Sequence, residues 1–110
     1  MDRFSEYRIM WVMVFFDLPT VTKKQLKAYN KFRNNLEKDG FCRFQLSIYM
    51  RSCGSRSNAL LHKNRVKGFL PEEGCVSTMT LTDKQFEDID IFYGKSPAKR
   101  PDAGIQLELF

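Results

Sequence analysis

Long apolar runs, close cysteine pairs and glycine-rich loops are all missing from this chain of 110 residues. No apolar segment approaches the roughly 20 residues that a membrane-spanning helix needs, and no basic and apolar leader opens the chain. Cys42, Cys53 and Cys75 lie at scattered spacings, which is typical of free thiols in a reducing compartment and disfavours a zinc or redox site. We therefore expect a cytoplasmic protein that does not bind a membrane.

Residues that would activate a nucleophile or hold a nucleotide are also scarce. His62 is the only histidine and lies beside Leu60 and Leu61 in a predicted helix, so we interpret it as structural rather than as a catalytic base. Without a glycine-rich phosphate loop, a nucleotide-binding enzyme is disfavoured. The hydrophobic fraction of 43% is that of an ordinary globular domain, and the length predicts one core.

Positive charge is concentrated in one part of the chain. Residues 23–67 contain twelve Lys or Arg against two acidic residues, whereas the rest of the chain has six bases and eleven acids. A surface that binds nucleic acid needs such asymmetry, because each neutralised phosphate releases counterions and adds affinity. The alternative is that these lysines only keep the outer faces of two helices in water.

The first half of the chain predicts a buried strand followed by a basic helix. Residues 9–16 are continuously apolar and rich in β-branched and aromatic side chains, which is typical of a central strand covered on both faces. A helix follows with its cap at Thr20 or Thr22 and ends at Asp39 and Gly40, where glycine favours a left-handed cap.

From residue 41 the hydrophobic period changes to two, which predicts one long strand over 41–51. Apolar side chains would share one face of this strand, and polar side chains the other. On that polar face, Tyr49 and Arg51 suit nucleic-acid contacts and a dimer interface equally well. The predicted polar face consists of Arg43, Gln45, Ser47, Tyr49 and Arg51.

The remaining elements are a second helix, a strand, one helical turn and a brief strand. The second helix begins at a cap at Ser55 or Ser57 and runs to about Phe69, and the strand covers residues 75–82. The helical turn follows a capping box of Thr82 and Gln85, and the brief strand covers residues 89–94. This order of strand, helix, strand, helix, strand and strand predicts an α/β sandwich with two helices on one face of a sheet.

Two segments divide the chain, residues 1–94 as the folded domain and 95–110 as a linker and tail. The linker contains two prolines and no periodicity, whereas residues 105–110 alternate like a strand. A strand this short is unstable alone, so we expect it to add to a sheet edge in its own chain or a partner. A frayed tail is the alternative.

Asp17 is the candidate functional carboxylate because it directly follows the buried strand. Its backbone would be held rigidly while its side chain is exposed at the end of the sheet. A magnesium site usually needs several hard oxygen ligands, and no second acid has a matching spacing, so a two-fold dimer would have to supply another Asp17. The alternative is a turn residue that accepts hydrogen bonds from backbone amides.

Three segments together resemble the CRISPR-associated protein 2 family. They are "VFFDLP" after the apolar strand, the basic "TKKQLKAYNKFRNNLEKDGF" and "RFQLSIYMR". The resemblance extends over about residues 9–94 and is closest to the versions from type II systems. It implies a homodimer of ferredoxin-like βαββαβ folds in which an extra C-terminal edge strand adds to the partner. It also suggests that "FCRFQ" and "SIYMR" are the two arms of a bent strand or of a tight hairpin near Gln45 to Ser47.

The resemblance further implies a metal-dependent endonuclease acting on RNA or DNA. In that family the aspartate that ends the first strand faces its dimer mate across a Mg²⁺ site, and this position is Asp17, the implied catalytic and metal-binding residue. The resemblance places four further residues near the same cleft in supporting roles. These are Arg43, Gln45, Ser47 and Tyr49.

Duplex binding is the other activity that the resemblance implies. Basic residues just after the first strand would contact the phosphate backbone without reading base sequence. They are Lys23 and Lys24, together with Lys27, Arg33 and Arg51.

Our leading hypothesis is a homodimeric scaffold of spacer acquisition. It would hold double-stranded prespacer DNA and bridge copies of the CRISPR integrase, with the type II effector machinery as a further partner. The alternatives are a Mg²⁺-dependent endonuclease and a toxin-like RNA nuclease of similar fold.

Overall fold

A computed structural model of the chain describes residues 8–97. Its elements are β1 (Met10–Asp17), α1 (Lys23–Lys38), β2 (Cys42–Gln45), β3 (Ile48–Cys53), α2 (Arg56–Lys67), β4 (Cys75–Thr82), α3 (Asp83–Glu87), β5 (Phe92–Tyr93) and β6 (Ser96–Pro97). The first four strands form an antiparallel sheet in the order β2-β3-β1-β4. This is an α+β fold with the ferredoxin-like strand order that the resemblance implies.

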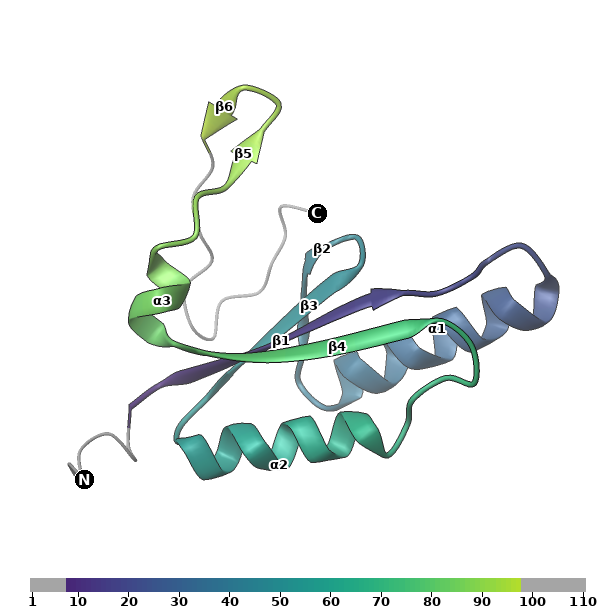
Figure 1. Ribbon diagram of the computed structural model, residues 1–110, viewed down its shortest axis with the longest axis horizontal. Helices are drawn as coiled ribbons and strands as arrows, with labels where there is room; N and C mark the ends of the chain where they lie inside the picture. The colour runs from purple at the N-terminus through teal and green to yellow at the C-terminus, as the bar shows by residue number, and fades with distance from the viewer. Residues whose placement is uncertain (1–7, 98–110) are drawn as a thin grey trace.

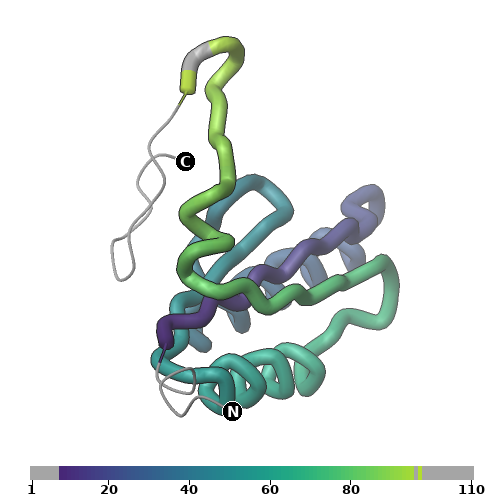
Figure 2. The backbone as a smooth tube through the Cα atoms, turned by 60° about the vertical axis from the view of Figure 1, so that its left-hand side comes forward, coloured from purple at the N-terminus to yellow at the C-terminus, as the bar shows by residue number. Residues whose placement is uncertain are grey.

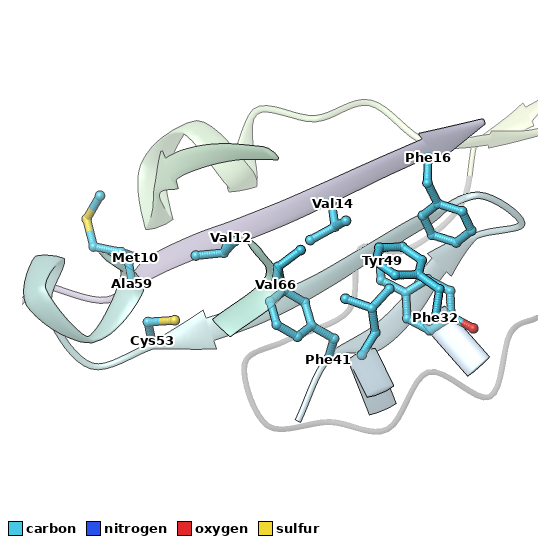
Figure 3. Close-up of a cluster of buried hydrophobic side chains, with 11 residues drawn as sticks. Met10, Val12, Val14, Phe16, Phe32, Phe41, Tyr49, Cys53, Ala59 and Val66 are labelled. Atoms are coloured by element: carbon cyan, nitrogen blue, oxygen red, sulfur yellow. The ribbon is translucent and has the colours of Figure 1, made fainter. Parts of the chain in front are cut away.

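Strand β1 lies in the middle of the sheet and is buried on both faces. Its even-numbered residues contact the core beneath α1 and α2, and Figure 3 shows Val12, Val14 and Phe16 in that cluster. Its odd-numbered residues Trp11 and Met13 belong to a second cluster on the opposite face. The run is continuously apolar because both faces of β1 are covered, as the sequence predicts.

Helix α1 begins and ends at the predicted signals. The hydroxyl of Thr22 accepts a hydrogen bond from the Gln25 amide at 3.1 Å, and the Gln25 side chain accepts one from the Thr22 amide at 3.0 Å. Of the two candidates, Thr22 is therefore the cap, and the capping box is complete. At the other end, Gly40 has φ of 87°, and a Cβ there would overlap the Arg51 guanidinium. The positive φ favours glycine at this position, whereas the end of the flexible Arg51 side chain could move away from a Cβ.

The predicted single strand over 41–51 is wrong, because the chain turns at Leu46 and Ser47 to form the β2–β3 hairpin, one of the two forms that the resemblance suggests. The register shifts between Arg43 and Gln45. The predicted polar face is also wrong at Tyr49, which is fully buried in the cluster beneath the helices.

Helices α1 and α2 cover the same face of the sheet (Figure 1). The hydroxyl of Ser55 accepts a hydrogen bond from the Asn58 amide at 3.1 Å, so Ser55 is the cap of α2. Helix α3 follows the predicted capping box at Thr82 and contributes to the opposite cluster. There the Phe86 ring stacks on Trp11 with centroids 3.9 Å apart, and Trp11 Nε1 donates to Asp83 at 2.8 Å.

The β5–β6 hairpin extends away from the four-stranded sheet (Figure 2). The predicted strand over 89–94 is shorter in the structure, at Phe92–Tyr93, and β6 at Ser96–Pro97 pairs with it inside the predicted linker. Phe92 and Tyr93 are exposed. The predicted tail strand at 105–110 lies outside the described residues.

Candidate functional site

Asp17 is the last residue of β1 and is exposed. Since side chains alternate along a strand, it points to the face of Met13, away from α1 and α2. Its partner across the β1–β4 ladder is Cys75. The preceding Gly74 has φ of 95°, and a Cβ there would lie 2.7 Å from the Asp17 carbonyl oxygen. Glycine therefore permits the chain to enter β4 beside Asp17.

One chain supplies an incomplete set of ligands for a divalent metal at Asp17. Between residues 8 and 97 there is no group of three or more His, Cys, Asp or Glu that could hold an ion. The Asp17 carboxylate is the hard oxygen donor that Mg²⁺ prefers, whereas the Cys75 thiol is not. Mg²⁺ is commonly held by one or two carboxylates and keeps several waters. Two copies of Asp17 would therefore suit Mg²⁺, and one copy alone is a weak site.

The four predicted cleft residues do not gather around Asp17. Ser47 lies at the same end of the sheet, where its carbonyl accepts a hydrogen bond from the Phe16 amide at 3.0 Å, and the exposed Gln45 ends β2 beside that turn. Arg43 pairs with Tyr49 across the hairpin, so both point to the helix-covered face, opposite Asp17. The structure therefore gives no support to the predicted cleft roles of Arg43 and Tyr49.

Tyr49 instead joins α1 to the sheet. Arg33 Nε donates a hydrogen bond to the Tyr49 hydroxyl at 3.0 Å, and that hydroxyl donates to Glu37 at 3.3 Å. The hydrogen bond to Tyr49 raises the pKa of Arg33, against the opposing effect of burial. The guanidinium of Arg33 is therefore turned toward the sheet, and its placement gives no support to the prediction that it binds nucleic acid.

Arg51 is also directed inward. It is half-buried on β3, its guanidinium lies against Gly40, and its Nε is buried without a hydrogen-bond partner among the described residues. This placement separates Arg51 from the exposed lysines of α1. Arg33 and Arg51 therefore do not belong to the exposed lysine surface of α1, and their binding of nucleic acid stays a prediction.

The exposed lysines of α1 form a continuous surface. Six residues recur at intervals of three, four or one along the side of the helix opposite the buried Phe32 and Leu36. We name them the outer face of α1, and they border one shallow hollow. The outer face consists of Lys23, Lys27, Asn30, Lys31, Asn34 and Lys38.

Within residues 8–97, no carboxylate forms an ion pair with the outer face of α1. Both ion pairs in this part of the chain are made by Asp39, with His62 and Arg65. Glu37, the single acid within α1, is bonded to Tyr49. The lysines can therefore meet an external anion. The sequence analysis named Lys23 and Lys27 as nucleic-acid contacts but gave no such role to Lys31, Lys38 or the two asparagines, although the helical period of 3.6 places all six on one side.

Asp39 ties the end of α1 to α2. His62 Nδ1 donates to one oxygen of Asp39 at 2.8 Å and Arg65 donates to the other at 2.9 Å. Burial raises the pKa of Asp39, but the hydrogen bonds from His62 and Arg65 outweigh it, so the pKa is lowered overall. The interpretation of His62 as a structural residue agrees with its burial in this network.

The three cysteines are free thiols, as the sequence predicts. Cys53 is buried beneath the helices, and burial raises the pKa of its thiol despite the nearby positive charge of Arg51. Cys75 is exposed beside Asp17. None of the helices between residues 8 and 97 has the length and apolar character required to cross a membrane.

The chain matches known proteins over most of its length. The model of the family described as CRISPR associated protein Cas2 matches residues 10–89. A "CRISPR-associated endoribonuclease Cas2" from Flavobacterium psychrophilum is 49% identical over 108 residues, which cover 98% of this chain and 94% of that protein. A protein of the same name from Parvibaculum lavamentivorans is 44% identical over 101 residues, covering 92% and 100%.

A solved structure has the same fold. It is described as "Crystal structure of cas2", and it superimposes with a TM-score of 0.54 at 20% identity, covering 86% of this chain and 99% of that one.

Proposed function

Because the chain belongs to the Cas2 family of CRISPR-associated proteins, we propose that it is a homodimeric scaffold of spacer acquisition. In this role it binds double-stranded prespacer DNA and bridges copies of the CRISPR integrase. The type II effector machinery is a further proposed partner. Family membership leaves the toxin-like alternative without support.

The observation that carries this proposal is the charge at the start of α1. Lys23 and Lys24 are its first two residues, and its first turn contains no acid. A helix N-terminus has a partial positive charge, so two cations there are unfavourable unless an anion is nearby. A phosphate backbone would supply that anion, and its lysine contacts would be independent of base sequence.

Dimer formation would cover apolar groups that one chain leaves in water. On the sheet face away from α1 and α2, Met79 is 43% exposed, and Leu46 at the hairpin turn is 66% exposed. Phe92 and Tyr93 form β5 and are both exposed. The β5–β6 hairpin has two residues in each strand and is therefore too short to be stable alone. Addition of this hairpin to the sheet edge of a second copy would stabilise it.

Salt-dependent binding tests the scaffold proposal. We expect the Lys23→Ala/Lys24→Ala variant to bind a DNA duplex with a shallower dependence of log affinity on log salt, by about 0.9 for each phosphate that the variant no longer neutralises. Lys63→Ala/Lys67→Ala removes the same charge from α2 and serves as the control. A slope equal to that of the wild type in the first variant would contradict the proposal.

Joining of spacer ends by the cognate integrase tests the bridging role. Wild type and Asp17→Ala are expected to stimulate joining into a repeat-containing plasmid equally, because the scaffold does not need the carboxylate. Stimulation by wild type alone would show that Asp17 participates in acquisition. No stimulation by either protein would contradict the bridging role.

An endoribonuclease is the second candidate function, favoured by the names of the relatives and by the exposed Asp17 at the end of β1. Two copies of Asp17 would hold the Mg²⁺ ion, which when bound activates water and stabilises the leaving oxygen. We expect Asp17→Asn to abolish cleavage while the dimer persists in sedimentation, and Cys75→Ser to retain cleavage. Cleavage that survives Asp17→Asn would assign the activity to another site or a contaminant.

A further inference from the structure

We infer that the outer side of α2 is a docking surface for an acidic amphipathic helix of another protein. The surface is built around Leu60 and Leu61 and lies on the side of the helix opposite its buried residues Ala59, His62 and Val66. The inference goes beyond the proposed duplex binding, since it concerns a different helix and a protein ligand.

Uncharged residues form a continuous stripe along the outer side of α2. Each of them is exposed, and neighbours are separated by three or four residues, the spacing that places side chains on one side of a helix. The stripe extends about 17 Å at 1.5 Å per residue, which is about three helical turns. We name it the leucine stripe of α2, and it consists of Ser57, Leu60, Leu61, Asn64 and Gly68.

The two leucines leave an apolar area in water. Leu60 is 58% exposed and Leu61 is 45% exposed. Each is three or four residues from both Ser57 and Asn64, so the leucines flank the centre of the stripe. No described helix or strand lies over the outer side of α2 in either view of the chain (Figure 1, Figure 2). Burial of the leucines therefore needs a partner from outside this part of the chain.

The spacing of the stripe suits a helical partner. Helices pack by placing ridges of side chains, three or four residues apart, into the grooves of a facing helix. The small residues Ser57 and Gly68 at the two ends of the stripe permit a close approach. An extended partner would find no backbone groups to pair with, because those of α2 are hydrogen-bonded within the helix. An amphipathic helix is therefore the expected form of the ligand.

Basic residues border the leucine stripe without carboxylate partners. Arg56, Lys63 and Lys67 recur at intervals of seven and four along one flank, and α2 contains no Asp or Glu. Both ion pairs between residues 8 and 97 are made by Asp39, and neither includes these three residues. Acidic residues beside the apolar seam of a partner helix would pair with them, as charges that border the seam of a coiled coil do.

The same charges disfavour a second copy of the chain as the occupant. A two-fold contact between copies of α2 would place one basic flank near the other, and like charges across an interface are unfavourable. The outer face of α1 is basic as well. Leucines at the centre of the surface also disfavour nucleic acid, because phosphates bind to cations and polar groups. An acidic protein helix satisfies both the leucines and the bases.

Two designed peptides test this inference. The probe is a fluorescein-labelled peptide of about three heptads with leucine at positions a and d and glutamate at e and g, where repulsion between glutamates prevents self-association. Its control has lysine in place of each glutamate. In fluorescence anisotropy with the full-length protein, we expect the acidic peptide to bind at least about tenfold more tightly than the basic peptide. Its affinity should fall as salt is added.

Substitutions in the protein locate the binding surface. Leu60→Ser/Leu61→Ser should weaken binding of the acidic peptide at least about tenfold, whereas Leu26→Ser, which changes an exposed leucine of α1, should leave it unchanged. Lys63→Gln/Lys67→Gln should weaken binding and make it less dependent on salt. This lysine variant keeps both leucines, so it tests the surface independently of any effect that the leucine changes have on folding.

Three results would overturn the inference and leave the proposed duplex scaffold untouched. They are binding of neither peptide, equal binding of the two peptides, and binding that the substitutions on α2 do not change. Weaker binding of a labelled DNA duplex by Leu60→Ser/Leu61→Ser in the same assay would assign the surface to nucleic acid and would overturn the inference as well.

Two further measurements detect a different occupant. In sedimentation velocity, larger assemblies of wild type than of Leu60→Ser/Leu61→Ser would assign the leucine stripe to a second copy. Tighter binding of the acidic peptide by Leu107→Ser/Leu109→Ser than by wild type would assign it to residues 98–110 of the chain itself. Either result would overturn the choice of another protein as the partner, and we expect neither.

Discussion

Helices α1 and α2 cover the same face of one sheet, but their outer sides differ. Each is anchored by buried residues, Phe32 and Leu36 in α1 and Ala59, His62 and Val66 in α2. On its exposed side α2 presents Leu60 and Leu61, 58% and 45% exposed, and its Arg65 is bonded to Asp39. Exposed bases occur on α2 as well, at Arg56 and Lys67, and α1 has one exposed leucine, Leu26. The helices therefore differ in the number of exposed leucines and in the ion pair of Arg65, and not in having a basic outer side.

The positions of the charges relative to the helix dipoles differ as well. In α2, Arg65 and Lys67 are in the last turn, where the partial negative charge of the C-terminus favours cations. In α1, Lys38 is likewise in the last turn, and Lys23 and Lys24 are in the first turn, where the dipole opposes them. Helix α2 also begins with a base, Arg56, and has no acid in its first turn, so α1 differs in having two bases at this end instead of one.

Removing the anchor of α1 is expected to have the largest effect. Phe32 is 1% exposed and packs edge to face on Phe16 with centroids 5.2 Å apart. Phe32→Ala should lower the free energy of unfolding by about 3–5 kcal/mol, as measured by urea denaturation. Val66→Ala, the matched change in α2, deletes fewer buried atoms and should cost less. Equal reductions of the free energy of unfolding in the two variants would contradict the larger contribution assigned to Phe32.

Breaking the link between the two helices comes next. Asp39→Asn leaves His62 and Arg65 without their carboxylate partner, and we expect the protein to be less stable by about 1–3 kcal/mol at neutral pH. Because the folded-state pKa of Asp39 is lowered, its contribution is present above the unfolded value of about 3.9 and disappears as pH falls through the folded pKa. The difference between variant and wild type in urea denaturation should therefore shrink below about pH 4. A difference that is constant with pH would contradict this role.

Moving two positive charges from α1 to α2 distinguishes binding by a specific surface from attraction by the net charge of the protein. Lys27→Gln/Lys31→Gln combined with Leu60→Lys/Asn64→Lys has the wild-type net charge, and positions 60 and 64 are exposed on α2. We expect duplex affinity at low salt to remain about tenfold below that of wild type, since the new lysines are not on the outer face of α1. Recovery of wild-type affinity in the anisotropy assay would show that net charge is sufficient.

The smallest expected effect is on the stability of α1 itself. Lys27→Glu replaces two repulsive pairs, with Lys23 and Lys31, by attractive ones, which should stabilise the protein by about 0.5 kcal/mol or slightly more. The same variant should bind the duplex more weakly than Lys27→Gln. Thermal melting checks the first effect and anisotropy the second. A variant that is less stable than wild type would contradict the proposed repulsion.

Elements with local signals were predictable from sequence. The strand β1 has an apolar run, α1 has a capping box and a terminal glycine, and α3 has its own capping box, and each signal involves residues adjacent in the chain. The β2–β3 hairpin was not predictable from the pattern, because alternation continues through Leu46 and Ser47 without a glycine or proline. Only the resemblance to a family suggested it.

The candidate site was predictable only in part, because the tertiary structure decides which face of the sheet is covered by the helices. The exposure of Asp17 follows from its place at the end of a buried strand. Tyr49 was assigned to an outer face because its neighbours are polar, but that face of the sheet is the one the helices cover, so polarity does not identify the outer side. Arg33 looks like any exposed base of α1 until Tyr49 is found beneath it.

The most direct test of the central claim is the chemical shift map of the protein titrated with a DNA duplex, recorded by two-dimensional ¹H–¹⁵N NMR. Our account predicts that the largest shifts fall on the outer face of α1, from Lys23 to Lys38, while residues of α2 and Asp17 change little. Shifts concentrated on α2 or on the sheet face that carries Asp17 would contradict it.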